Sequence, residues 1–257
     1  MTRSRRPAFA LAFAVSLIAV PATAAPHPAG NAPAPEKSAV NPAAKTAALE
    51  LARLLYSEES QVAIAERMVD TDMAAAFRAN PDFQALEIDY PGVTDAVLKE
   101  MKPVLIRYTR AELPTYYDRV ATLIASRLDA AEIADLTQFY QTPLGQKLRR
   151  GMQDNVTVKA MLTEVTTEPD KPTSYSAVDA DHRAATDAAK KLIDKGDEPA
   201  LIAFAKKPYF ARLAAMGPAM RKLEQDFMNE PAPEFEAEIE AIVKATFARF
   251  EAAGKKK

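Results

Sequence analysis

Apolar residues recur at every third or fourth position along nearly all of the chain from Pro42 onward, and this spacing predicts α-helices. No run of four or more residues alternates apolar and polar side chains with the enrichment in β-branched residues that is typical of a strand. The 257 residues include only seven glycines, too few for the regular turns of a β-barrel or sandwich. The pattern predicts an all-α protein, an antiparallel helical bundle.

The apolar spacing predicts three helices in the N-terminal part of the chain. Alanine-rich residues 43–56 form one helix, and Ser57 is placed to cap a second, which ends at Asn80 because the residue before a proline leaves the α region. We expect residues 82–92 to form a loop. A third helix follows and is kinked or restarted at Pro103, since an interior proline costs about 3 kcal/mol.

The most regular apolar stripes lie between residues 113 and 165. Pro114 suits the first turn of one helix, and Asp129 begins a capping-box start for the next. Thr142 followed by Pro143 starts a third, whose stripe continues through Asn155 to Leu162. The connections between these three helices are very short. They therefore predict that the helices lie beside each other as antiparallel neighbours.

The second part of the chain echoes this block without gaps, at one constant offset, and this echo is a candidate internal repeat. The pairs are Leu136 with Leu201, Phe139 with Phe204, Pro143 with Pro208, Lys147 with Arg212 and Leu148 with Leu213. Helical hairpins share apolar spacing without common ancestry, so a duplication is one of two explanations. With residues 166–176 as a linker, we expect two related helical-hairpin halves, residues 43–165 and 177–252, followed by a basic tail, residues 253–257.

In the C-terminal half, the apolar stripes predict helices over residues 177–194, 198–206, 208–228 and 234–252. The acidic residues from Glu224 to Glu240 are expected to form a solvated helix face.

One stretch of the first half resembles a known bacterial family, the domain-of-unknown-function 2059 family, over about residues 108–160. The residues that carry the resemblance are Glu132, Ile133, Leu136, Phe139, Tyr140, Thr142, Pro143, Gly145 and Lys147. The resemblance implies an exported helical protein and implies no catalytic residue. If the distinctive residues bind something, the candidate partner or ligand surface is Tyr140, Pro143, Gly145 and Lys147. The second half has Ala205 and Phe210 where the first has Tyr140 and Gly145.

The N-terminal segment, residues 1–24, has the organisation of a cleavable signal peptide. Three arginines precede an apolar run over residues 10–20, and Ala22-Thr23-Ala24 is an A-x-A cleavage site, which places the cut after Ala24. The run is too short for a transmembrane anchor, which needs about 20 apolar residues, so we expect no stable membrane span after processing. The residues after the arginine pair do not fit the twin-arginine pattern, and Sec export to the periplasm or medium is favoured.

Residues 25–42 contain five prolines and are expected to form a solvated, extended tether. Removal of the segment that ends at Ala24 takes away three arginines and no acids, so the formal charge of the chain changes from −2 to −5. That charge gives no reason to expect a nucleic-acid partner.

Candidate chemistry is sparse. The chain has no cysteine, which excludes disulfides, thiolate metal sites and a cysteine nucleophile. Its two histidines, His27 and His182, lack metal-ligand spacing, and we expect His182 to be exposed. No metal, cofactor or catalytic constellation is expected.

Three functions stay open. The first is a non-enzymatic exported protein that binds a protein or envelope component in a groove between the halves. The second is a helical assembly module that self-associates through the last helix. The third is a hydrolase-like enzyme using Glu132 and Asp135, although two carboxylates one turn apart on the same helix are too local to flank a scissile bond.

Overall fold

A computed structural model describes residues 41–168 and 170–254, and this part of the chain is helical without a β-strand, as the sequence predicts. The signal peptide with its cut after Ala24, most of the tether and the last three lysines fall outside the described residues. The helices are α1 (Pro42–Leu55), α2 (Glu58–Arg67), the π-helical turn η1 (Met68–Met73), α3 (Ala74–Ala79), α4 (Pro81–Asp89), α5 (Val93–Ala125), α6 (Ala130–Gln141), α7 (Pro143–Asp154), α8 (Lys159–Thr167), α9 (Tyr175–Lys190), α10 (Glu198–Ala205), α11 (Phe210–Ala215), α12 (Gly217–Met228) and α13 (Pro233–Gly254).

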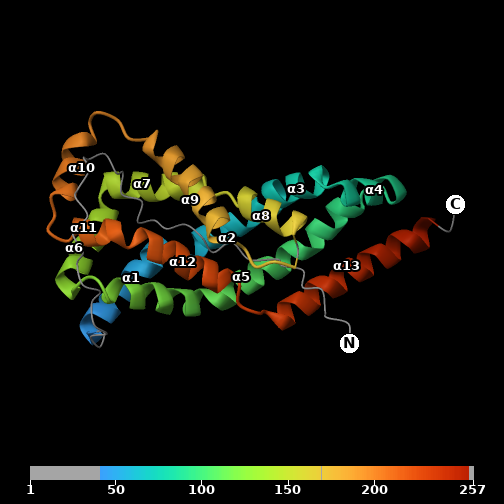
Figure 1. The fold of residues 1–257 in the computed structure, drawn as a ribbon, viewed down its shortest axis with the longest axis horizontal. Helices are drawn as coiled ribbons and strands as arrows, with labels where there is room; N and C mark the ends of the chain where they lie inside the picture. Colours follow the sequence, from blue (N-terminus) through green and yellow to red (C-terminus); the bar gives the residue numbers. More distant parts are fainter. Residues whose placement is uncertain (1–40, 169, 255–257) are drawn as a thin grey trace.

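The long helix α5 is the axis of the fold. Helices α1, α2, α12 and α13 pack against it, and α9 covers α7, α8 and α12 on the other side. Figure 1 shows α5 and α13 running along the length of the molecule, with α6, α10 and α11 at one end and α3 and α4 at the other. Buried apolar residues from both predicted halves join in one core cluster. No helix of the described segments is both long and apolar enough to cross a bilayer.

Several helix starts follow directly from the sequence. Ser57 caps α2 through its side chain. Asp129 and Glu132 form a complete capping box at the start of α6, and the Thr142 side chain caps α7 while Pro143 occupies its first turn. Each cap satisfies amide groups that an uncapped helix would leave without a partner.

The loop predicted over residues 82–92 is wrong, because most of it is helix α4. Asn80 ends α3, but its side chain also accepts a hydrogen bond from the Asp82 amide, and Pro81 takes the first helical position. The pair therefore ends one helix and begins another. No residue of α4 is buried.

A restart of the helix at Pro103 and a helix start at Pro114 are not found. Pro103 and Pro114 both lie inside one continuous helix, so Pro114 does not begin a new one. Both prolines are exposed, while α5 buries its apolar residues against surrounding helices that include α1, α2, α12 and α13. The packing of that apolar face outweighs the local cost of the two prolines.

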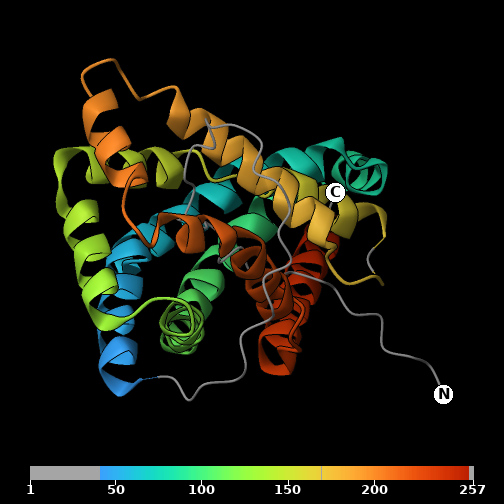
Figure 2. The same ribbon diagram turned by 60° about the vertical axis from the view of Figure 1, so that its left-hand side comes forward.

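The arrangement of α5, α6 and α7 differs from the predicted antiparallel neighbours. Figure 2 shows α6 running across from the end of α5 to the start of α7, transverse to both. Helix α1 packs against both α5 and α6. Short connections hold helix ends close together but leave the angle between the helices free, and α1 fills the space beside α5.

Three boundaries in the later part of the chain also need correction. The helix expected to continue through Asn155 to Leu162 breaks after Asp154 and resumes as α8. The predicted helix over 208–228 is divided into α11 and α12, and the helix expected to reach residue 194 ends at Lys190. At the first break, the carboxylates of Asp72 and Asp181 accept hydrogen bonds from the amides of Val158, Ala160 and Met161, replacing bonds that a continuous helix would make.

Candidate functional site

The family-like residues meet at the corner between α6 and α7. The Thr142 hydroxyl donates to the Phe139 carbonyl (2.6 Å) and accepts from the Gly145 amide (3.1 Å), which joins the last turn of α6 to the first turn of α7. A Cβ at Gly145 would lie 2.6 Å from the Cα of Tyr140 and closer still to the Phe139 carbonyl oxygen. Only glycine allows the two helices to approach this closely.

The four residues of the predicted surface have different structural roles. Tyr140 is only 4% exposed and belongs to the core, and burial raises the pKa of its hydroxyl. Gly145 is buried in the corner, and Pro143 is exposed at the start of α7. Lys147 lies apart from the corner and forms ion pairs with Asp194 (2.7 Å) and Asp197 (2.6 Å), which tie α7 to the segment before α10. The structure therefore does not bring all four residues onto one surface.

A groove of about 450 Å³ opens beside this corner, between α6 and the start of α7 on one wall and α10 on the other. Phe139 and Phe204 stack in its wall with ring centroids 3.8 Å apart and planes inclined by 10°. These rings are one of the pairs in the candidate internal repeat, so the two similar segments touch each other here. Pro143, Ala200 and Ala203 add exposed apolar surface.

A polar cluster closes one edge of the groove. Asp135 accepts from the Lys207 ammonium (2.7 Å) and from the Tyr209 hydroxyl (2.6 Å). These two hydrogen bonds hold the pKa of Asp135 below its usual value. Burial and the Asp135 carboxylate together raise the pKa of Tyr209. Asp135 is thus held as a carboxylate and fixes the segment after α10 against α6.

The two carboxylates considered for hydrolysis have structural partners. Glu132 completes the capping box of α6 and forms an ion pair with Arg212, and Asp135 binds Lys207 and Tyr209. Their hydrogen bonds join α6 to residues 207–212. Within the described residues there is no group of three or more acidic or histidine side chains that could hold a metal ion.

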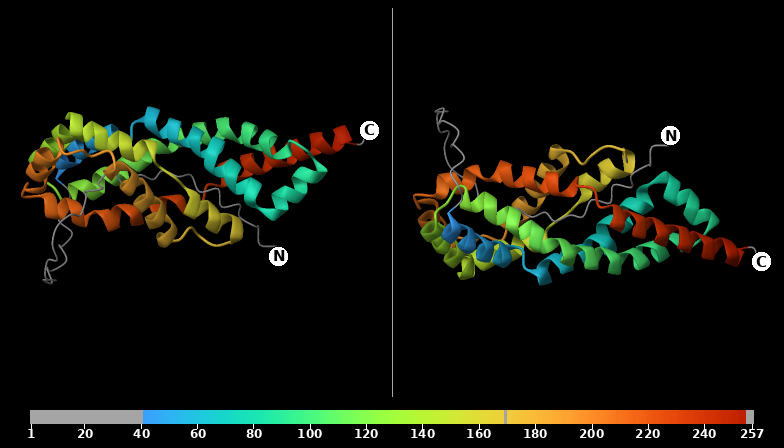
Figure 3. Two further views of the ribbon diagram at one scale, coloured as in Figure 1. Left: turned by 90° about the horizontal axis from the view of Figure 1, so that it is seen from above. Right: turned by 90° about the horizontal axis from the view of Figure 1, so that it is seen from below.

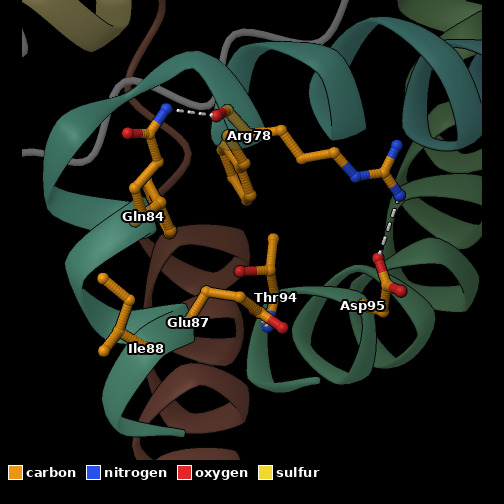
Figure 4. Close-up of a pocket in the computed structure, with 8 residues that line it drawn as sticks. Arg78, Gln84, Glu87, Ile88, Thr94 and Asp95 are labelled. Atoms are coloured by element: carbon orange, nitrogen blue, oxygen red, sulfur yellow. Dashed lines mark hydrogen bonds and ion pairs between the residues drawn. The ribbon is translucent and has the colours of Figure 1, made fainter. Parts of the chain in front are cut away.

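A second hollow, of about 390 Å³, lies under α4 at the opposite end of the molecule. Figure 4 shows the Arg78 side chain reaching Asp95 across its mouth, with Glu87 and Thr94 inside and Ile88 at the edge. Glu87 accepts hydrogen bonds from the Gly92 and Thr94 amides, and the bond from Gly92 contributes most to lowering the pKa of Glu87. The Glu87 carboxylate thus binds amide groups at the start of α5, and Arg78 binds Asp95 in the first turn of the same helix.

A buried polar network lies between α5, α9 and α12. The His182 ring is hydrogen-bonded to the Glu224 carboxyl group, with side-chain exposures of 5% and 0%, and the Tyr116 hydroxyl donates to Glu224 (3.3 Å). The predictions of an exposed His182 and of a solvated face including Glu224 are therefore wrong. Glu224 falls on the buried stripe of Met220 and Phe227, so the helical periodicity itself could have placed it inside.

The α10 wall of the groove is not apparent from the sequence. Phe204 stands out only as the partner of Phe139 in the candidate repeat, and neither Lys207 nor Tyr209 belongs to a recognisable motif. The available signal was the position of Lys207 and Tyr209, which follow a helix that aligns with the family-like block.

Comparison with known proteins identifies the segment at the corner. Residues 117–161 match the family model described as "Uncharacterized protein conserved in bacteria (DUF2059)", which confirms the resemblance seen in the sequence. The match covers the end of α5, all of α6 and α7 and the first residues of α8. No curated protein and no solved structure matches the chain.

Proposed function

We propose that this chain is an exported, non-enzymatic helical protein that binds a protein or another component of the bacterial envelope in the groove between the α6–α7 corner and α10. The observation that carries the proposal is the groove itself, which has an apolar wall of stacked Phe139 and Phe204 and a fixed ion pair at its edge. An apolar wall with a few convergent polar groups is typical of a binding site.

The placement of the groove supports the proposal. One wall comes from the segment that matches the family, and the other comes from α10, in the second half of the chain. The corner residues hold the first wall rigid, and Lys147, Asp135 and Glu132 bind the second wall to it. A site fixed by packing and ion pairs can hold a partner without first reorganising.

Export to the periplasm, or to the medium, is proposed from the N-terminal pattern of charge, apolar run and cleavage site. Expression of the full chain with a C-terminal tag in a bacterium tests this directly. We expect the tagged protein outside the cytoplasm with Ala25 as its first residue. An uncut chain retained in the cytoplasm would contradict export.

Binding in the groove is tested by filling it. Ala203→Trp places a large ring in the groove from an exposed position, and Ala75→Trp places the same ring on an exposed position of α3 as a matched control. After chemical cross-linking in whole cells, we expect at least one partner recovered with the wild-type protein and with Ala75→Trp, and at least tenfold less of it with Ala203→Trp. Equal recovery with both variants would rule out the groove.

A further inference from the structure

A third groove, of about 540 Å³, lies between the middle of α5 and the turn from α12 to α13. Its apolar part includes Val104, the half-buried Tyr108, Pro231 and Pro233. The Tyr108 ring packs on Phe235 at 4.5 Å between centroids, so the floor of the groove is fixed in place. Figure 3, in the view from below, shows α13 lying along α5 beyond this turn.

The rim of this groove is strongly acidic. Four glutamates line it and one arginine, Arg107, opposes them, which leaves a formal charge of −3. Arg107 is paired with Glu238, and Arg119 just outside the groove is paired with Glu230. Among the described residues, no cation lies within ion-pair distance of the other two, Glu112 and Glu234.

The local field agrees with this excess of negative charge. Burial, together with the carboxylates of Glu112, Glu230 and Glu236, raises the pKa of Tyr108 to about 12. An occupant of this groove therefore needs positive charge to balance the carboxylates and aliphatic groups to cover the tyrosine and the prolines. Lysine side chains carry both.

The chain itself contains such a segment, Lys255–Lys257, directly after α13. Their positive charges are opposite in sign to the carboxylates of Glu112 and Glu234. The 22-residue helix α13 begins at the groove and extends about 33 Å from it, at about 1.5 Å per residue. The three lysines span at most about 10 Å, so they cannot return to the groove of their own chain.

The lysines of one copy reach the groove of another if the two copies are related by a two-fold axis across the middle of α13. Two copies of α13 lying antiparallel place the end of each helix beside the start of the other. A register that sets Lys255 beside Glu234 also brings Ala241 beside Ala248 and Glu240 beside Arg249 of the second helix. All of these positions within the helix are exposed in the single chain, so no core residue has to move.

We propose that the groove at the start of α13 binds the Lys255–Lys257 segment of a second copy of this chain, in a two-fold dimer in which the exchange is reciprocal. An isologous contact of this kind closes at two copies and does not extend into a filament. Its area is that of two helices about 33 Å long, so the dimer is expected to be weak and sensitive to salt.

The chain has no cysteine, which makes disulfide trapping a clean test. In the mature protein carrying Glu234→Cys and Lys255→Cys, position 234 lies about 30 Å from the end of α13 at Gly254, at about 1.5 Å per residue. One further residue spans less than about 4 Å, so the two thiols of one chain cannot bond to each other. Mild oxidation at micromolar concentration should give a covalent dimer linked between positions 234 and 255. The control Lys195→Cys with Lys255→Cys keeps the tail cysteine and moves the other to an exposed site distant in sequence. Absence of the 234–255 link, or equal dimer yield in the control, would overturn the proposal.

Sedimentation supplies the second measurement. We expect dimerisation to weaken at least tenfold when Lys255, Lys256 and Lys257 are changed to glutamine, and similarly in Glu112→Gln with Glu234→Gln. Changing three exposed lysines elsewhere, Lys159, Lys195 and Lys206, to glutamine alters the net charge equally and should leave dimerisation intact. A chain that stays monomeric up to millimolar concentration at low salt, or that a lysine-rich peptide binds without any dimer forming, contradicts the proposal.

Discussion

Gly145 shows how a single residue sets the geometry of the binding groove. Its missing side chain lets the first turn of α7 lie directly on the Phe139 carbonyl and Tyr140, and Thr142 bridges the same two turns. The family-like motif therefore encodes a helix corner. A ligand is proposed for the surface beside that corner and not for the motif residues as a group.

Gly145→Ala is expected to lower the free energy of unfolding by about 1–3 kcal/mol, because the added methyl group meets backbone atoms that cannot move independently. Gly151→Ala, in the same helix, is the control. Its methyl group would meet the end of the Leu192 side chain, which can rotate away, and would lie 3.3 Å from the Cα and Cβ of Ala189, so a smaller loss is expected. Urea unfolding of both variants measures the difference, and a Gly145→Ala protein as stable as Gly151→Ala would contradict this role for the corner.

Asp135 gives the groove edge a dependence on pH. Because its pKa is lower in the folded chain than in the unfolded chain, its stabilising effect is present above the unfolded pKa, near 4, and is lost as the pH falls through the folded pKa. The side chains of Asp135 and Lys207 are 34% and 41% exposed, so solvent screening limits the effect to about 0.5–1 kcal/mol.

Asp135→Asn should therefore be less stable than wild type at pH 7, and the difference should shrink at pH 3. Urea unfolding at the two pH values measures this. A difference that is the same at both, or larger at pH 3, would show that Asp135 does not act through its charge.

At the level of whole elements, α9, α12 and α5 are joined by the buried group of His182, Glu224 and Tyr116. Burying charge costs free energy unless the charge is paired, so removal of one partner leaves the other unfavourably placed. The contact between these three helices therefore includes a buried polar group beside its apolar residues.

We expect Glu224→Gln to lower the free energy of unfolding by about 3 kcal/mol and Tyr116→Phe by about 1 kcal/mol, since the latter removes only one hydroxyl donor. His182→Gln combined with Glu224→Gln should cost less than the sum of the single changes. Urea unfolding of the four variants measures these differences, with the exposed Glu240→Gln as control. Additive effects in the double variant would show that the pair does not act as a unit.

The ends of the helices show which features of the fold can be predicted from the local sequence. Capping residues such as Ser57, Asp129 and Thr142 mark helix starts reliably, because each cap depends only on its nearest neighbours. The continuity of α5 through two prolines depends on the helices packed around it, and the break after Asp154 depends on carboxylates from η1 and α9. Residues that are far apart in the sequence make these contacts, so the sequence around each proline or break does not predict them.

For the whole molecule, the sequence predicted the all-α class and the family-like block, and the structure and the comparison confirm both. It could not predict that α6 crosses the ends of α5 and α7, or that α10 packs beside the corner to make a groove. Helical periodicity tells which face is buried but not which helix covers it. The candidate surface consequently combined a core residue, Tyr140, with exposed Pro143.

Binding of a partner in the groove between α6–α7 and α10 is the central claim, and photo-cross-linking from inside the groove tests it most directly. A photoreactive amino acid at Ala200 lies in the groove, and the same residue at Ala75 lies on α3 away from it. In intact cells, we predict a discrete cross-linked partner from position 200 that is absent from position 75 and is lost when Ala203→Trp is added. The same products from both positions, or a product from position 200 that persists with the groove filled, would contradict the claim.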